Sequence, residues 1–60
     1  MRREKLILSR YAHSLKQKDV AKYLGVSIAR YCKIETGTGN PTLKQIQMLI
    51  KLLKINISYF

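Results

Sequence analysis

Apolar side chains recur three or four residues apart through four stretches of the chain. This spacing places them on one face of an amphipathic helix. The pattern therefore predicts four helices, which cover residues 3–13, 16–24, 27–35 and 42–53. Residues 55–60 alternate between apolar and polar side chains, which predicts either a strand or one last helical turn.

The expected core consists of the inward faces of these helices. In the first helix the inward stripe is Leu6, Arg10 and His13, with Ile7 and Tyr11 beside it. The inward positions of the other helices are Val20, Ala21 and Leu24, then Tyr31 and Ile34, and finally Leu43, Ile46, Leu49, Ile50 and Leu53. Arg10 is the unusual member, because a charged group on an inward stripe needs a partner. The pattern predicts one all-α domain over residues 1–60.

Residues with specific local roles mark the ends of the helices. Ser27 and Thr42 are placed as N-caps, because their hydroxyls can accept a hydrogen bond from the first helical turn. Gly25 stands at a sharp turn, where a positive φ costs glycine little. Gly37 is expected to end the third helix in the same left-handed region.

The second and third predicted helices together have the layout of a helix-turn-helix. They meet at Gly25, and the small Ala21 lets two helices cross closely. In this motif one helix supports the next, which enters the major groove of DNA. Residues 17–35 therefore predict binding to duplex DNA.

The composition narrows the class of partner. Twelve Lys and Arg stand against three Asp and Glu, so the net charge is +9 over 60 residues. Such a surplus suits nucleic acid or an anionic membrane surface. A run of about 18 apolar residues, which a membrane span needs, is absent from the sequence.

Candidate chemistry beyond binding is sparse. Cys32 is the only cysteine and His13 the only histidine, so neither an intrachain disulfide nor a Cys/His metal cluster can be assembled. The chain offers no catalytic set, and we expect no enzyme activity, cofactor, metal or small-molecule ligand. A lone thiol is compatible with a reducing cytoplasm, which is the expected location.

Four stretches of the sequence carry a resemblance to a known family. They are Leu15-x-Gln17-x-x-Val20-Ala21-x-x-Leu24-Gly25-Val26-Ser27, Ile34-Glu35-x-Gly37, Asn40-Pro41-Thr42-Leu43 and Leu53-x-Ile55-x-Ile57. As a set they resemble the lambda-repressor-like family of phage repressors and Cro proteins, the XRE-type helix-turn-helix, over residues 3–60. The resemblance implies a compact bundle of four to five helices, with residues 57–60 as the start of the fifth. It also implies an ion pair between Arg10 and Glu35.

Four positions outside the expected reading helix depart from the usual pattern of that family. Lys16 stands where members carry a Ser, Thr or Asn cap, and this loss is expected to cost about 1 kcal/mol. Ser14 and Lys54 stand where a glycine is common, so each is expected to place a non-glycine residue in a tight turn. Ser9 stands where members usually carry an apolar residue. None of the four belongs to the surface expected to read DNA.

The first residues of the helix after Ser27 are the expected base readers. Lys33 can donate to guanine O6 and N7, while Ile28 and Ala29 can pack on thymine methyl groups. Family members often carry Gln or Arg at position 28 and a polar residue at position 29, so this readout is unusually apolar. Arg30 is expected to point sideways, towards a phosphate or a flanking base.

Phosphate contacts are expected from residues around this helix. Gln17 matches a family position that bonds the DNA backbone, and it begins a helix whose N-terminal amides favour an anion. The other candidates are Ser27, Thr38, Gly39, Asn40 and Lys44. Arg2, Arg3 and Lys5 are expected to form either a loose arm or a solvated cluster.

These features predict a sequence-specific transcriptional regulator of the phage or plasmid repressor type, which binds a double-stranded DNA operator. A homodimer would use Leu52, Ile55, Ile57, Tyr59 and Phe60, although Ile57 and Phe60 are alternatively expected to close the core. The alternative function is an antitoxin or protein-bridging module of the same fold, whose main partner is a protein. A third possibility is non-specific binding to nucleic acid or a membrane surface through charge alone.

Overall fold

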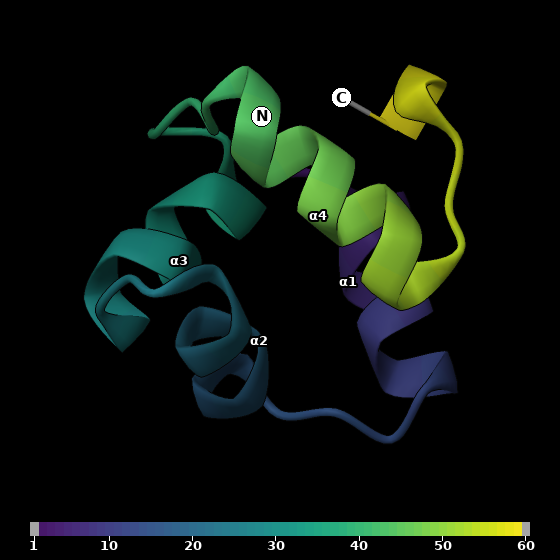
Figure 1. Cartoon of the computed structure of the whole chain (residues 1–60), viewed down its shortest axis with the longest axis horizontal. Coiled ribbons are helices and arrows are strands. Elements are labelled where there is room, and N and C mark those ends of the chain that lie inside the picture. Colours follow the sequence, from purple (N-terminus) through teal and green to yellow (C-terminus); the bar gives the residue numbers. More distant parts are fainter. Residues whose placement is uncertain (1, 60) are drawn as a thin grey trace.

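The computed structural model describes residues 2–59 and contains four α-helices followed by one 3-10 turn (Figure 1). The helices are α1 (Glu4–Ala12), α2 (Gln17–Leu24), α3 (Ile28–Thr36) and α4 (Leu43–Leu53), and the 3-10 turn η1 is Ile57–Tyr59. The four predicted helices are confirmed, with ends shifted by at most one residue. Because η1 is helical, the predicted last helical turn at the C-terminal end is confirmed, and the alternative prediction of a strand is wrong. Within residues 2–59, no helix is long and apolar enough to cross a membrane.

The core lies where the inward faces of the four helices meet. Its largest fully buried side chains are Tyr31, Leu6, Ile34, Leu49, Leu53 and Val20. Ala21 and Leu24 are buried as well, which confirms the inward face predicted for α2. Figure 1 shows α2 and α3 together on one side of the molecule, with α4 crossing towards the opposite side in front of α1.

Three residues predicted on or beside an inward face are exposed instead. His13 lies beyond the end of α1, so it no longer follows the helical face, and its Nδ1 lies 2.9 Å from the carbonyl oxygen of Ser9. Tyr11 is 63% exposed because its neighbour Arg10 occupies the inward position. Leu43, 66% exposed, is the first residue of α4 and lies outside the covered part of that helix.

Capping of the helices follows the sequence closely. The Ser27 hydroxyl accepts a hydrogen bond from the Arg30 amide at 3.1 Å, and the Thr42 hydroxyl accepts one from the Gln45 amide at 3.2 Å. Lys16 supplies no side-chain acceptor at the start of α2. Instead, the Asp19 carboxylate accepts the Lys16 amide hydrogen at 2.9 Å, so one half of a capping box remains.

Left-handed turns join the helices. Gly25 and Gly37 have φ values of 74° and 85°, which confirms the conformations expected for these glycines. Ser14 and Lys54 adopt φ values of 56° and 54° without being glycine. Each of these two residues therefore carries local strain of about 1 kcal/mol or more.

The C-terminal segment contributes to the core as well as to the surface. Ile55 is only 8% exposed, so its prediction as part of a dimer surface is wrong. The chain turns back beside α4 after Lys54 (Figure 1), which brings Ile55 inward. Ile57 is 62% exposed and does not close the core, whereas Tyr59 packs against it. Phe60 lies outside the described residues.

Candidate nucleic-acid interface

Helix α3 has one face fixed in the core and the opposite face open to solvent. Tyr31, Ile34 and Glu35 are at most 2% exposed. The four predicted base readers lie on the open face, and they are Ile28, Ala29, Arg30 and Lys33. Because the buried face fixes the rotation of the helix, these side chains are presented to a partner in one orientation.

Helices α2 and α3 form the predicted helix-turn-helix. The Val26 amide donates to the Ala21 carbonyl oxygen at 3.0 Å, which closes the turn around Gly25. Ser27 then caps α3, with its hydroxyl oxygen accepting from the Arg30 amide. A hydroxyl can accept and donate together, so the Ser27 hydrogen remains for an outside acceptor such as a phosphate.

A buried ion pair links α1 to the end of α3. Arg10 Nε lies 2.6 Å from Glu35 Oε2, and Arg10 Nη2 donates to Glu35 Oε1 at 3.3 Å. This is the pair that the family resemblance implied, and it gives the inward arginine its partner. Arg10 Nη1 also donates to the Leu15 carbonyl oxygen at 3.0 Å, so the pair holds the turn between α1 and α2 as well.

The ion pair sets the charge states around it. Burial alone would raise the pKa of Glu35, but hydrogen bonds from Arg10 and Gln17, beside the Tyr31 hydroxyl, outweigh burial and lower it below its ordinary value of 4.5. The hydrogen bond to Glu35 raises the pKa of Arg10. Burial raises the pKa of Tyr31, whose enclosed hydroxyl makes no hydrogen bond of good geometry to residues 2–59. At neutral pH the pair is therefore fully charged and Tyr31 is neutral.

Gln17 is the first residue of α2, and the ion pair holds its side chain. Gln17 Nε2 donates to Glu35 Oε1 at 3.0 Å. An amide nitrogen carries two hydrogens, so one remains for a phosphate. Next to Gln17 lies an open pocket of about 440 Å³, whose lining includes Arg2 and Lys16. The surroundings of the predicted phosphate contact are thus positively charged.

The loop between α3 and α4 is bonded back onto α3. The Lys33 carbonyl oxygen accepts hydrogen bonds from the amides of Gly37, Thr38 and Gly39 at 3.1, 3.1 and 3.0 Å. The amides of Thr38 and Gly39 are thus already satisfied within the protein. Thr38 keeps its hydroxyl, which lies 3.1 Å from the Thr36 hydroxyl, and the loop can offer side chains rather than these amides to a phosphate.

Arg3 is not the loose or solvated residue that the sequence suggested. Its amide donates to the Glu35 carbonyl oxygen at 2.8 Å. Its Nη1 donates to the carbonyl oxygens of Ile34 and Gly39, and its Nη2 lies 3.5 Å from Asn40 Oδ1. Sequence reasoning missed these contacts because the partners lie 31 to 37 residues further along the chain.

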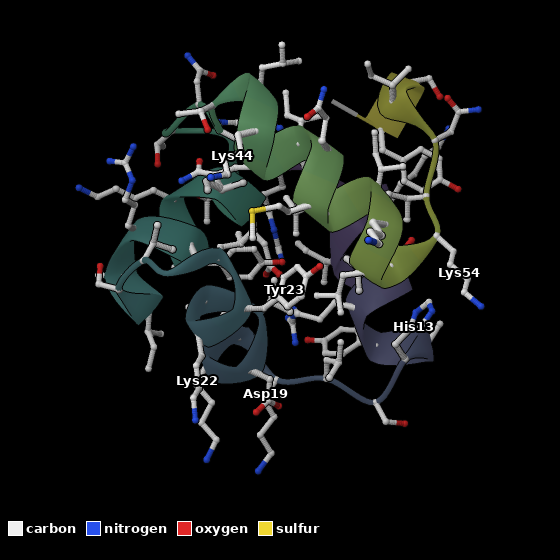
Figure 2. All side chains as sticks on the ribbon, viewed as in Figure 1. His13, Asp19, Lys22, Tyr23, Lys44 and Lys54 are labelled. Carbon is white, nitrogen blue, oxygen red and sulfur yellow. The ribbon has the colours of Figure 1, made fainter. Side chains whose placement is uncertain are left out.

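Basic side chains are spread over the whole molecule. Lys44 lies on the first turn of α4, directly after the α3–α4 loop (Figure 2). His13 and Lys54 lie on the side opposite to α3, while Lys22 points outward from α2 (Figure 2). Charge alone therefore does not single out the α3 face.

Comparison with known proteins agrees with this geometry. A family model described as Helix-turn-helix (HTH_3) matches residues 2–60, nearly the whole chain. No curated protein and no solved structure matches the chain significantly. The matched family is DNA-binding and non-catalytic, and its fold is lambda-repressor-like, as observed here. The protein therefore belongs to the XRE/Cro/cI type of the helix-turn-helix family of DNA-binding domains.

Proposed function

We propose that the protein is a sequence-specific regulator of transcription, of the repressor type, that acts in the cytoplasm and reads double-stranded DNA with α3. The observation that carries this proposal is the exposed face of α3, set on a helix whose other face is locked in the core. The major groove of B-DNA is about 12 Å wide and admits an α-helix. A rigid helix with an open N-terminal face fits that groove.

The exposed side chains of α3 would recognise the DNA bases through both apolar and polar contacts. Ile28, 53% exposed, and Ala29 would pack on thymine methyl groups near the start of the helix. Lys33, about one turn later, would donate to guanine O6 and N7. Arg30 would bind a flanking base or phosphate. We therefore propose a half-site that combines thymines with one guanine.

Groups on both sides of α3 would hold the phosphates. The proposed donors are the second amide hydrogen of Gln17, the hydroxyls of Ser27 and Thr38, the side-chain amide of Asn40 and the ammonium of Lys44. Gly39 has its amide and carbonyl occupied, and a Cβ there would lie 3.1 Å from Lys33 Cβ. We propose that Gly39 serves the site by letting the loop pack directly on Lys33.

Selection of duplexes from a random DNA library tests this function directly. The purified protein should enrich a short motif with thymines and a guanine at fixed spacing. Enrichment of a palindrome would support a homodimer through Leu52, Ile57 and Tyr59, with half-sites about 10–10.5 bp apart. If no sequence is enriched and the affinity depends only on salt concentration, the protein binds DNA non-specifically through its charge, and the proposed function is contradicted.

A protein partner is the second candidate, and exposed apolar side chains favour it. Leu8, Leu43 and Ile57 are each more than 60% exposed. Such groups gain free energy when a partner covers them. If the purified chain ignores every duplex yet forms a stoichiometric complex with a protein, the antitoxin or bridging function replaces the proposed one.

A further inference from the structure

Arg3 lies directly before α1 and is anchored to that helix. Its carbonyl oxygen accepts hydrogen bonds from the amides of Leu6 and Ile7 at 3.1 and 3.2 Å. Its own amide donates to the Glu35 carbonyl oxygen at 2.8 Å. The backbone of Arg3 is therefore held between the start of α1 and the end of α3, and its side chain extends from a fixed base.

The Arg3 guanidinium connects a carbonyl group at the end of α3 to a carbonyl group of the loop that follows it. Nη1 donates to the carbonyl oxygen of Ile34, in the last turn of α3, and to that of Gly39 at 3.1 Å. The final carbonyls of a helix have no partners within it and carry the negative end of the helix dipole. A guanidinium is planar and offers five donors, so it can bridge such acceptors where a single ammonium cannot.

The segment held in this way adjoins two residues of the proposed DNA interface. Gly39 donates its amide to the Lys33 carbonyl oxygen, and a Cβ at Gly39 would make a tight contact of 3.1 Å with Lys33 Cβ. Asn40 turns Oδ1 towards Arg3 Nη2, at 3.5 Å. Because the oxygen end of this exposed amide faces Arg3, its nitrogen end, which carries two donor hydrogens, is directed elsewhere.

We propose that Arg3 is a positioning residue for the DNA interface. It clamps residues 37–40 against the last turn of α3, and it acts on DNA through Asn40 and Lys33 without contacting DNA itself. This inference rests on the proposed function, because it concerns the same interface.

Three variants separate this clamp from a plain effect of charge. Arg3→Lys keeps the charge but loses the fork, Arg3→Gln loses both, and Arg2→Gln removes a neighbouring exposed charge that makes no side-chain hydrogen bond within residues 2–59. Arg3→Lys should weaken binding to the selected duplex about tenfold, which corresponds to about 1.4 kcal/mol, with an unchanged salt slope. Arg2→Gln should weaken binding less than Arg3→Lys does, and it should make the affinity less dependent on salt concentration.

A scan with single methylphosphonates, which remove the charge of one phosphate each, identifies the contact that the clamp serves. In the wild-type complex, neutralising the phosphate next to residues 37–40 should weaken binding, and Asn40→Ala should abolish that effect. In Arg3→Lys the same neutralisation should cost nothing, while the phosphate next to Gln17 keeps its full effect. Backbone amides of Thr38 and Gly39 should also exchange faster with solvent in free Arg3→Lys.

The outcomes distinguish failure of the clamp from failure of the function. If Arg3→Lys binds and exchanges as the wild type does, or if no phosphate beside residues 37–40 contributes in the wild type, the clamp is overturned. An equal loss in Arg3→Gln and Arg2→Gln, with Arg3→Lys unaffected, would make Arg3 a simple charge. If the wild type prefers no duplex at all, the proposed function fails, and normal exchange at Thr38 in Arg3→Lys would then overturn the clamp separately.

Discussion

Side chains only two positions apart on α3 lie in different surroundings, some in the core and others in solvent. Tyr31 and Glu35 are enclosed in the core, whereas Lys33, between them in sequence, is exposed. Successive residues of an α-helix are rotated by about 100°, so one helix can serve the core with one face and a partner with the other. The proposed function requires that changes on the two faces have different consequences.

Lys33→Ala should change which sequence is preferred. Loss of a donor to guanine should cost about 1–3 kcal/mol on the selected duplex and remove the preference at one base pair. Lys51→Ala, an exposed residue in the last turn of α4, is the matched control and should leave the preferred motif unchanged. Titration of both variants with the selected duplex and its point variants measures this. Equal losses on all sequences would contradict base reading by Lys33.

Glu35→Ala should affect folding far more than Lys44→Ala. Removing one partner of a buried ion pair leaves the Arg10 charge uncompensated, at a cost of about 3–5 kcal/mol. Lys44 is exposed, so its loss should change the free energy of unfolding by less than about 0.5 kcal/mol. Thermal denaturation of both variants gives the comparison. Similar melting temperatures would mean that the pair contributes little.

At the scale of helices and turns, the features that could be predicted from the sequence are those set by residues close together along the chain. Helical spacing placed all four helices, and Ser27 and Thr42 marked the starts of α3 and α4, because period and capping are local properties. The exposure of Leu43 was mispredicted, since it depends on how far the other helices reach.

The candidate site also contains features that could be predicted from the sequence and contacts that could not. The open face of α3 could be predicted from its helical spacing, and the Arg10–Glu35 pair came from the resemblance to a family. The hydrogen bond from Gln17 to Glu35 and the contacts of Arg3 with the α3–α4 loop were not predicted. They join residues 18 to 37 positions apart, and no local pattern signals such a contact.

The turn after α4 gives a prediction at this scale. Lys54 has a left-handed backbone, so Lys54→Gly should relieve strain and raise the free energy of unfolding by up to about 1 kcal/mol. Lys51→Gly makes the same replacement inside α4 and should lower it by about 1 kcal/mol. Chemical denaturation of both variants measures the difference. A loss of stability in Lys54→Gly would show that the turn is not strained.

For the molecule as a whole, charge should attract DNA and shape should select the face that binds. A net charge of +9 surrounds a body with a radius of gyration of 10.0 Å, and lysines lie on several sides of it. Such a field speeds encounters with a polyanion in many orientations. The α2–α3 side carries the helix proposed to enter the groove, so this side should set the bound orientation.

Acid should destabilise the whole molecule through Glu35. Its pKa is lowered in the folded protein, so its contribution to stability is fully present above its ordinary pKa of 4.5. That contribution should be lost as the pH falls below this value through the folded pKa. Denaturation at a series of pH values should show this decline, and Glu35→Gln should flatten it. An identical pH profile in that variant would show that Glu35 does not cause the loss of stability in acid.

Amide chemical shifts recorded while an operator-like duplex is added test the central claim most directly. If α3 enters the major groove, the largest changes should lie in residues 27–33, with further changes at Gln17 and in residues 38–40. The far end of α1 and the turn around Lys54 should change little. Saturable binding that leaves residues 27–33 unshifted would contradict the account, because DNA would then be held by another surface.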